Sequence, residues 1–328
     1  MRPYYFQKDE KIIDKVRNKD RWNIFIGDVH NCGIELLALL NKVGDYLDKI
    51  GCSRTEKVNV WFLGDLIHKG RSDNLSIILN NTSKGNNRYN GYDFTYDCIL
   101  GNHEDNHIAW KQGLRTEYTD GYQETEDVLK GFGIDLQYEA FPVTIDFLYP
   151  NKIITIGHAY SSSSSGTDNV LFYNQLSKRD LLYYLRLRYE DLRGELVRLG
   201  KENPKQDIFW AQNYCNENEK PGHQEVVLFG HQCSYDSANG GPKYPLIYNN
   251  EDTSTLCIGL DTGCVHGGAL SALVVSPKGD MHLVQVPSRM VYEAPKPIMK
   301  MVPNRHLGNY HLDSRLHDVV ISDVVIVS

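Results

Sequence analysis

The sequence predicts an α/β fold with a ligand site at the strand ends, and two patterns lead to this prediction. From Asn23 to about Gly157, short apolar runs alternate with helix-like stretches such as 34–50 and 74–79, which is the βαβ pattern of a layered α/β protein. Five apolar runs, which have the length of buried strands, each end in a glycine followed by Asp, Asn or His. In open α/β sheets, ligands bind at this carboxyl edge. The five runs are 23–26, 58–63, 96–100, 153–156 and 226–229.

Length and composition limit the class of protein. A chain of 328 residues can form one large α/β domain with an insertion, or two modest domains, without disulfide support. No apolar run reaches the roughly 18 residues of a membrane span, and residues 1–5 lack the apolar stretch of a signal peptide. Seven cysteines with no Cys-x-x-Cys pair fit reduced thiols. We therefore expect a soluble, cytoplasmic protein with no membrane partner.

The formal charge of the chain is −7. A basic surface supplies most of the affinity of nonspecific nucleic-acid binding. Bulk nucleic-acid binding is therefore not expected as the main activity.

The chain is expected to have three parts. Residues 1–22 form a charge-rich helix or ordered arm, residues 23–287 the main domain, and residues 288–328 a tail that ends in a strand within 319–327. The connection from His158 to His231 far exceeds the roughly 4–6 residues of an ordinary loop, so we predict an insertion at about 161–222.

The insertion is predicted to be a helical cap beside the strand ends. It opens with the serine-rich stretch 161–166 and continues with Ser177 as an N-cap, with Asp180 three positions on. Its leucines recur near helical spacing: Leu181, Leu182, Leu185, Leu192, Leu196 and Leu199. Its arginines are interleaved with acidic residues, which favours a solvated helix face over contact with an anionic substrate. They are Arg179, Arg186, Arg188, Arg193 and Arg198.

Three further strands follow the insertion, at 256–260, 272–275 and 282–286, and we expect them to form a second sheet. Residues 277–280 (Pro-Lys-Gly-Asp) are typical of a hairpin turn. The strand predicted at the end of the tail would pair either with the core sheet or with another subunit.

The polar residues after the five runs are suited to metal binding. Carboxylate, imidazole and amide donors fit Mn²⁺, Fe, Zn²⁺ or Mg²⁺ and do not form a thiolate site. Two cations about 3.5–4 Å apart share one carboxylate, for which Asp65 is the natural bridge. We expect Asp28 and His30 on one cation and Asn102, His158 and His231 on the other. His103, beside Asn102, is placed to be a general acid.

In order along the chain, these clusters resemble the signature blocks of the calcineurin-like metallophosphoesterases, specifically the phosphoprotein phosphatase branch. The resemblance spans about 23–269, and the blocks are 27–31, 64–70, 101–104, 157–159 and 230–231. It implies a four-layer sandwich of two β-sheets flanked by helices, here with the helical insertion. It also implies two divalent cations, with Mn²⁺ favoured, and hydrolysis of a phosphate ester or anhydride by a metal-bound hydroxide.

The chain departs from this branch at two places. The branch usually carries Asp-Arg where this sequence has His68 and Lys69; the Asp orients the catalytic His and the Arg holds phosphate. Lysine contacts phosphate as a point charge without the bidentate fork of arginine. Leu100 replaces a second arginine, which usually precedes Gly-Asn-His. We expect Lys69 to contact phosphate and Arg71 to stand in for a missing arginine.

The stretch 261–270 (Asp-Thr-Gly-Cys-Val-His-Gly-Gly-Ala-Leu) resembles a block of the symmetrical diadenosine tetraphosphatases, their bacterial and phage phosphatase relatives, and the phosphatase module of bacterial polynucleotide repair enzymes. It favours a nucleotide or dinucleoside polyphosphate as substrate. Three alternatives stay open: a serine/threonine protein phosphatase acting on phosphoproteins, a phosphatase of nucleic-acid ends, and a metal-binding protein with little turnover.

Overall fold

A computed structural model shows the fold of the chain. The residues that it describes are 12–17, 20–83, 88–116, 121–161, 170–191, 193, 195–197, 207–217, 224–235, 244–250, 254–294, 318–321 and 324–327. Most of the predicted arm and tail, the serines at 162–165, and Leu192, Arg198 and Leu199 lie outside these ranges.

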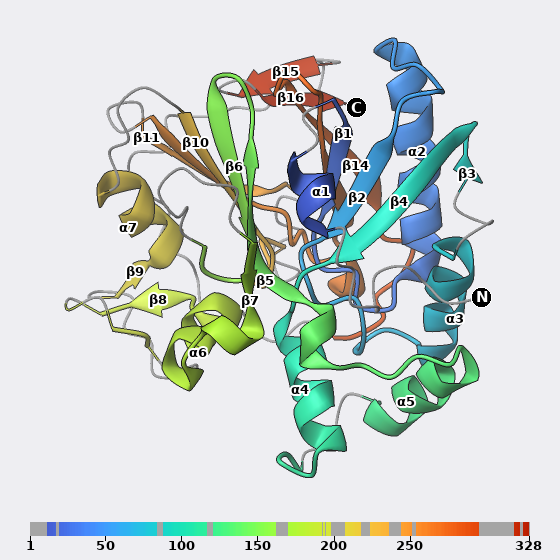
Figure 1. Cartoon of the computed structure of the whole chain (residues 1–328), viewed down its shortest axis with the longest axis vertical. Coiled ribbons are helices and arrows are strands. Elements are labelled where there is room, and N and C mark those ends of the chain that lie inside the picture. Colours follow the sequence, from blue (N-terminus) through green and yellow to red (C-terminus); the bar gives the residue numbers. More distant parts are fainter. Residues whose placement is uncertain are drawn as a thin grey trace.

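Two β-sheets pack face to face at the centre of the molecule (Figure 1). Within the described residues, the first sheet has eight strands in the order β15-β16-β14-β13-β1-β2-β4-β3, and the second has six, in the order β11-β12-β10-β6-β5-β7. The strands of the first sheet are β1 (Trp22–Ile26), β2 (Val58–Phe62), β3 (Arg88–Tyr89), β4 (Tyr92–Cys98), β13 (Ala269–Val275), β14 (Met281–Pro287), β15 (Asp318–Ile321) and β16 (Val324–Val327). Those of the second are β5 (Pro142–Leu148), β6 (Lys152–Gly157), β7 (Val170–Phe172), β10 (Gln224–Phe229), β11 (Leu246–Asn250) and β12 (Thr255–Gly259).

Helices cover the outer face of each sheet. On one side of the sandwich lie α2 (Gly33–Lys49) and α3 (Ser72–Asn81), and on the other lies α7 (Trp210–Glu217) (Figure 1). The layers are therefore helix, sheet, sheet and helix. The predicted sandwich of two sheets flanked by helices is confirmed.

The strands follow the period of two that a doubly covered sheet requires. In β1, Ile24 and Ile26 pack in the core beneath α2, whereas Phe25 points into the core between the sheets. In the inter-sheet core, Phe147 of β5 lies edge-on to Phe25 and to Trp61, with ring centroids 5.2 and 5.1 Å apart. Because both faces are buried, these strands appear in the sequence as continuous apolar runs.

The three strands after His231 do not form a sheet of their own, so that prediction is wrong. Strand β12 joins the second sheet parallel to β10, whereas β13 and β14 form a hairpin in the first sheet. The segment between β12 and β13 crosses from one sheet to the other, and Gly263 and Gly267 adopt positive φ angles there. The predicted turn at 277–280 does connect β13 and β14.

The two ends of the chain also pack on the sandwich. Helix α1 (Ile12–Arg17) places Ile12 and Val16 in the core between the sheets. At the other end, β16 pairs in parallel with β14, and β15 pairs with β16. The tail strand was expected to pair either with the core sheet or with another subunit, and in this structure it pairs with the core sheet.

The described part of the insertion contains α6 (Lys178–Arg186), α7 and a pair of short strands, β8 (Tyr189–Glu190) and β9 (Ile208–Phe209). Ser177 caps α6 by accepting a hydrogen bond from the backbone N–H of Asp180 at 3.2 Å. The helix ends at Arg186, and Leu196 instead forms a β-bridge with Glu190. The leucine spacing therefore predicted a longer helix than the one that forms.

Two further sequence expectations concern cysteines and membranes. All seven cysteines lie among the described residues and are free thiols. No helix in the described ranges combines the length and apolar character of a membrane span.

We predict that Phe147→Ala destabilises the fold by about 3–5 kcal/mol, because it leaves a cavity between the two sheets. Urea unfolding followed by tryptophan fluorescence measures the loss. Leu182→Ala is the control, since Leu182 is 48% exposed on α6. Equal midpoints for the two variants would contradict the assignment of the inter-sheet core.

Candidate active site

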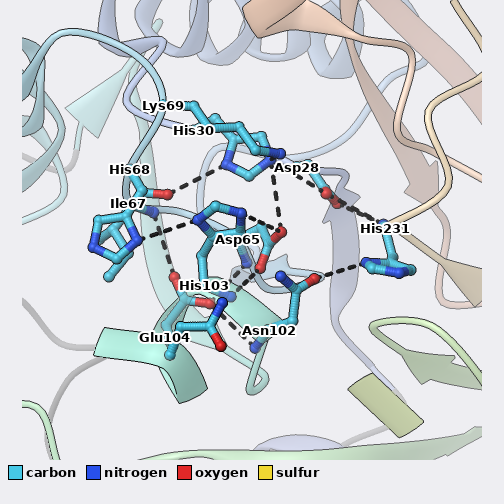
Figure 2. A network of polar contacts seen from close by, with 12 residues as sticks. Asp28, His30, Asp65, Ile67, His68, Lys69, Asn102, His103, Glu104 and His231 are labelled. Carbon is cyan, nitrogen blue, oxygen red and sulfur yellow. Dashed lines mark hydrogen bonds and ion pairs between the residues drawn. The ribbon is translucent and has the colours of Figure 1, made fainter. Parts of the chain in front are cut away.

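All six predicted metal ligands lie together where the strands of the two sheets end. Figure 2 labels Asp28, His30, Asp65, Asn102 and His231 among them. Asp28 and His30 follow β1, Asp65 follows β2, and Asn102 begins α4 (Asn102–Lys111). His158 follows β6 and His231 follows β10 in the second sheet. The site therefore lies between the carboxyl ends of parallel strands from both sheets.

Asp65 is at the centre of this cluster. Two groups of described residues within this cluster have ligand atoms within 4.8 Å of one another: His30, Asp65 and His103, and Asp65, His158 and His231. Asp65 Oδ2 lies 3.6 Å from His30 Nε2, and Asp65 Oδ1 lies 3.3 Å from His158 Nε2. One carboxylate thus faces both groups, each oxygen toward a different one.

The remaining predicted ligands connect the cluster across the two sheets. Asn102 Oδ1 lies 3.0 Å from His158 Nε2 and 2.7 Å from His231 Nδ1. The carboxylate of Asp28 accepts a hydrogen bond from the backbone N–H of His231 at 3.0 Å, and Asp28 Oδ2 lies 3.7 Å from His30 Nε2. Residues from β1, α4, β6 and β10 therefore converge on one volume.

The charges of the cluster fit bound divalent cations. Burial, together with the neighbouring Asp261, raises the pKa of Asp28 well above its ordinary value. Burial likewise lowers the pKa of His30 and of His231 well below the ordinary value. Metal is bound by deprotonated carboxylates and neutral imidazoles, and a cation between crowded carboxylates relieves the repulsion that raises the pKa of Asp28. The donor set therefore fits divalent cations.

Asp65 and His158 form a tighter pair within the cluster. Although burial acts in the opposite direction, His158 and His103 hold the pKa of Asp65 well below its ordinary value. Burial also opposes protonation of His158, but Asp65 raises the pKa of that imidazole to about 9.

The loop that carries Asp65 is held by Glu104, which the sequence analysis did not assign. Glu104 Oε2 accepts from the backbone N–H groups of Asp65 at 2.8 Å and Gly101 at 3.1 Å. Its Oε1 accepts from those of Leu66 at 2.9 Å and Ile67 at 3.3 Å. Burial, with the charge of Asp65, raises the pKa of Glu104 to about 7. The position directly after His103 was the available signal.

Backbone geometry marks the same place. Of the eight described non-glycine residues with positive φ, six belong to the site: His30, Asn31, Asp65, His68, Lys69 and His231. Such conformations cost about 1–3 kcal/mol each and persist where surrounding structure enforces them. At Gly64, φ is +84° and a Cβ atom would lie 2.6 Å from Gly101 Cα. Only glycine therefore allows β2 and β4 to end so close together.

Of the two residues predicted to contact phosphate, Lys69 lies at the ligand cluster and Arg71 does not. Lys69 Nζ lies 2.8 Å from His30 Nε2, and Lys69 lines a pocket of about 300 Å³ with Asn31, Ser72 and Glu124. Arg71 is not brought into the ligand cluster, because its exposed guanidinium pairs with Asp73 at 2.7 Å.

Among the described arginines of the insertion, Arg188 reaches the cluster. Arg188 Nε donates to His231 Nε2 at 3.1 Å. Arg179 instead pairs with Glu195 on the surface at 2.7 Å, and Arg186 pairs with Asp105 at 2.7 Å. A solvated face, the interpretation favoured from the sequence, therefore describes Arg179 but not Arg188.

A family model described as calcineurin-like phosphoesterase matches residues 23–250, well over half of the chain. The chain belongs to the calcineurin-like phosphoesterase family. It is accordingly a phosphatase, a hydrolase of the metallophosphoesterase class, and enzymes of this family use divalent metals. The matched range contains all six predicted ligands and His103.

Two curated relatives of this calcineurin-like phosphoesterase have the same general name. The symmetrical bis(5'-nucleosyl)-tetraphosphatase of Buchnera aphidicola is 25% identical, over 77% of this chain and 95% of the relative. The asymmetrical bis(5'-nucleosyl)-tetraphosphatase PrpE of Oceanobacillus iheyensis is 27% identical, over 86% of this chain and 98% of the relative. A crystal structure of a candidate diadenosine tetraphosphatase has a TM-score of 0.46 and 19% identity, covering 83% of this chain and 95% of that chain.

We predict that Glu104→Gln destabilises the protein by about 2–3 kcal/mol. The amide NH₂ group would replace one carboxylate oxygen, and this donor would then face backbone N–H groups that are also donors. Guanidinium unfolding at pH 8 measures the change. Glu139→Gln, the same substitution at an exposed glutamate, is the control. Equal stability of the two variants would show that the Asp65 loop is held by other contacts.

Proposed function

We propose that the chain is a dinuclear-metal phosphatase that hydrolyses a nucleotide or dinucleoside polyphosphate. The observation that carries the proposal is the position of Asp65, whose two oxygens face different groups of ligand atoms. A carboxylate shared in this way suits two cations about 3.5–4 Å apart. Asp28, His30 and Asp65 would hold the first cation. Asp65, Asn102, His158 and His231 would hold the second, and Mn²⁺ is the favoured metal.

When bound, two divalent cations supply Lewis-acid stabilisation of the phosphate and lower the pKa of an attacking water. The chain supplies the proton for the leaving group. His103 Nε2 lies 4.0 Å from Asp65 Oδ2, at the edge of the ligand cluster. The water oxygen forms the new bond to phosphorus as the bond to the leaving oxygen breaks. His103 protonates the leaving oxygen, and a proton of the water restores His103.

Lys69 and Arg188 are the cationic residues proposed to hold the phosphate. Each contacts a proposed ligand imidazole, Lys69 at His30 and Arg188 at His231. Arginine can bind two phosphate oxygens with its fork, whereas lysine provides a point charge. Arg188 would thus replace the arginine that the family usually carries at the positions of Lys69 or Leu100.

The substrate class is supported by the block at 261–270 and by the names of the two curated relatives. The catalytic unit is proposed to span 23–287, with the insertion at about 161–222 forming one wall of the substrate site. Arg188 is the residue of the insertion whose contact with His231 supports this placement.

We predict that the chain with added Mn²⁺ hydrolyses diadenosine tetraphosphate faster than p-nitrophenyl phosphate or a phosphoserine peptide. Initial rates on the three substrates, with calorimetry for two Mn²⁺ per chain, test this prediction. Asp65→Asn is expected to lose activity on all three, since it removes the shared carboxylate. Preference for the peptide would favour a protein phosphatase. Metal binding without turnover would favour a binding protein.

We also predict that Arg188→Ala lowers kcat/KM by about 10- to 100-fold, because it removes a charge-assisted contact to phosphate worth about 1.5–3 kcal/mol. Arg179→Ala is the matched control from the same insertion, since Arg179 is exposed and paired with Glu195. Equal effects of the two substitutions would rule out a direct phosphate contact by Arg188.

A further inference from the structure

His103 is the first member of a hydrogen-bond relay, a continuous series of side chains formed by His103, His68, His107 and Glu126. Its Nδ1 lies 3.2 Å from His68 Nδ1, and His68 Nε2 lies 3.0 Å from His107 Nδ1. His107 Nε2 in turn lies 3.0 Å from Glu126 Oε2. Figure 2 shows the first of these contacts, between His68 and His103. Both ring nitrogens of His68 and both of His107 thus contact a neighbouring side chain of the relay.

Three elements of the fold supply the residues of this relay. His103 and His107 are four residues apart on α4, so they lie on one face of the helix. Glu126 comes from α5 (Tyr122–Gly131), and His68 from the loop after β2, where its φ is +71°. The left-handed backbone at His68 is uncommon for a residue with a side chain. It places this imidazole between the two helices.

The four side chains of this hydrogen-bond relay are buried. His68 and His107 are 0% exposed, Glu126 5% and His103 6%. The ring of Tyr122 lies 4.4 Å from that of His68 and stacks on that of His107, with an interplanar angle of 7°. The second oxygen of Glu126 lies 3.6 Å from Lys111 Nζ and 3.5 Å from Lys130 Nζ. The carboxylate is therefore anchored from two sides.

The carboxylate of Glu126 determines which ring nitrogen of each histidine in the relay carries a proton. An ionised carboxylate only accepts hydrogen bonds, whereas a neutral imidazole donates from one nitrogen and accepts at the other. His107 must then donate from Nε2 to Glu126 and accept at Nδ1. His68 consequently donates from Nε2 to His107 and accepts at Nδ1. That leaves His103 as the donor from its own Nδ1.

We infer that His68, His107 and Glu126 are positioning residues that keep a proton on His103 Nδ1 and turn its Nε2 toward the substrate. This role rests on the proposed function, in which His103 is the general acid. This role explains how His103 can be oriented although His68 stands where the family usually has a single aspartate. In this chain a carboxylate three contacts away performs the same task through two imidazoles.

Histidine tautomers provide a test that does not depend on turnover. In the full chain labelled with ¹⁵N-histidine and loaded with diamagnetic Mg²⁺, two-bond ¹H–¹⁵N spectra should show His68 and His107 protonated on Nε2. Glu126→Gln should mix or reverse these tautomers, since a glutamine amide can also donate. Glu225→Gln, the same change at a buried glutamate that accepts from Tyr214, should leave them unchanged. His68 protonated on Nδ1 in the wild type, or tautomers unaffected by Glu126→Gln, would overturn the relay.

Leaving-group dependence tests the consequence for catalysis. Glu126→Gln should lower kcat on glycerol 2-phosphate, whose alkoxide needs a proton, by about 10- to 100-fold. It should leave kcat on p-nitrophenyl phosphate unchanged, because that leaving group departs without one. His107→Phe keeps the ring beside Tyr122 but removes both nitrogens, and should act in the same way. It serves as the second variant if Glu126→Gln does not fold.

The outcomes separate the relay from the proposed function. An equal loss on both substrates, with Mn²⁺ still bound, would overturn the relay but leave the phosphatase standing. No loss on either substrate would do the same. A wild-type chain without turnover on any phosphate ester or anhydride would overturn the proposed function and, with it, the role of the relay.

Discussion

The site depends on one buried carboxylate, that of Glu104, which accepts hydrogen bonds from four backbone N–H groups. Three of these belong to the loop after β2 and one to the end of the β4 segment. The carboxylate therefore ties together the two strand ends that carry Asp65 and Asn102. A positive φ at Asp65 can persist because its N–H is fixed in this way. The backbone N–H of His103 then donates to Asp65 Oδ1 at 2.8 Å.

Charge is arranged around this frame in a consistent order. Carboxylates occupy the centre of the cluster, where cations would bind, and imidazoles surround them. The proposed relay extends the arrangement outward, because His68 places no negative charge beside His103, and the carboxylate of Glu126 lies two imidazoles away. Lys111 and Lys130 near Glu126 balance that charge. An aspartate at position 68 would bring the negative charge next to the ligand cluster.

The insertion has a part in the site that local sequence features do not reveal. Arg188 lies two residues beyond the end of α6, in a segment that alternates basic and acidic residues. That pattern is typical of a solvated surface, and it describes Arg179 correctly. Arg188 differs because its segment, paired through β8 and β9, packs against the second sheet near His231, which follows β10. The proposed phosphate contact of Arg188 therefore could not be located from the family positions at Lys69 and Leu100 alone.

The sequence by itself determined the buried strands, the two-sheet sandwich through its family resemblance, and the residues that converge at the strand ends. Local chain geometry was sufficient, since a polar residue directly after a buried strand must lie at the sheet edge. Tertiary structure alone decided that β12 and β13 belong to different sheets, that α6 ends at Arg186, and that Glu126 meets His107. These features are contacts between elements far apart in sequence, and side-chain packing selects them. No periodicity or spacing along the chain encodes such contacts.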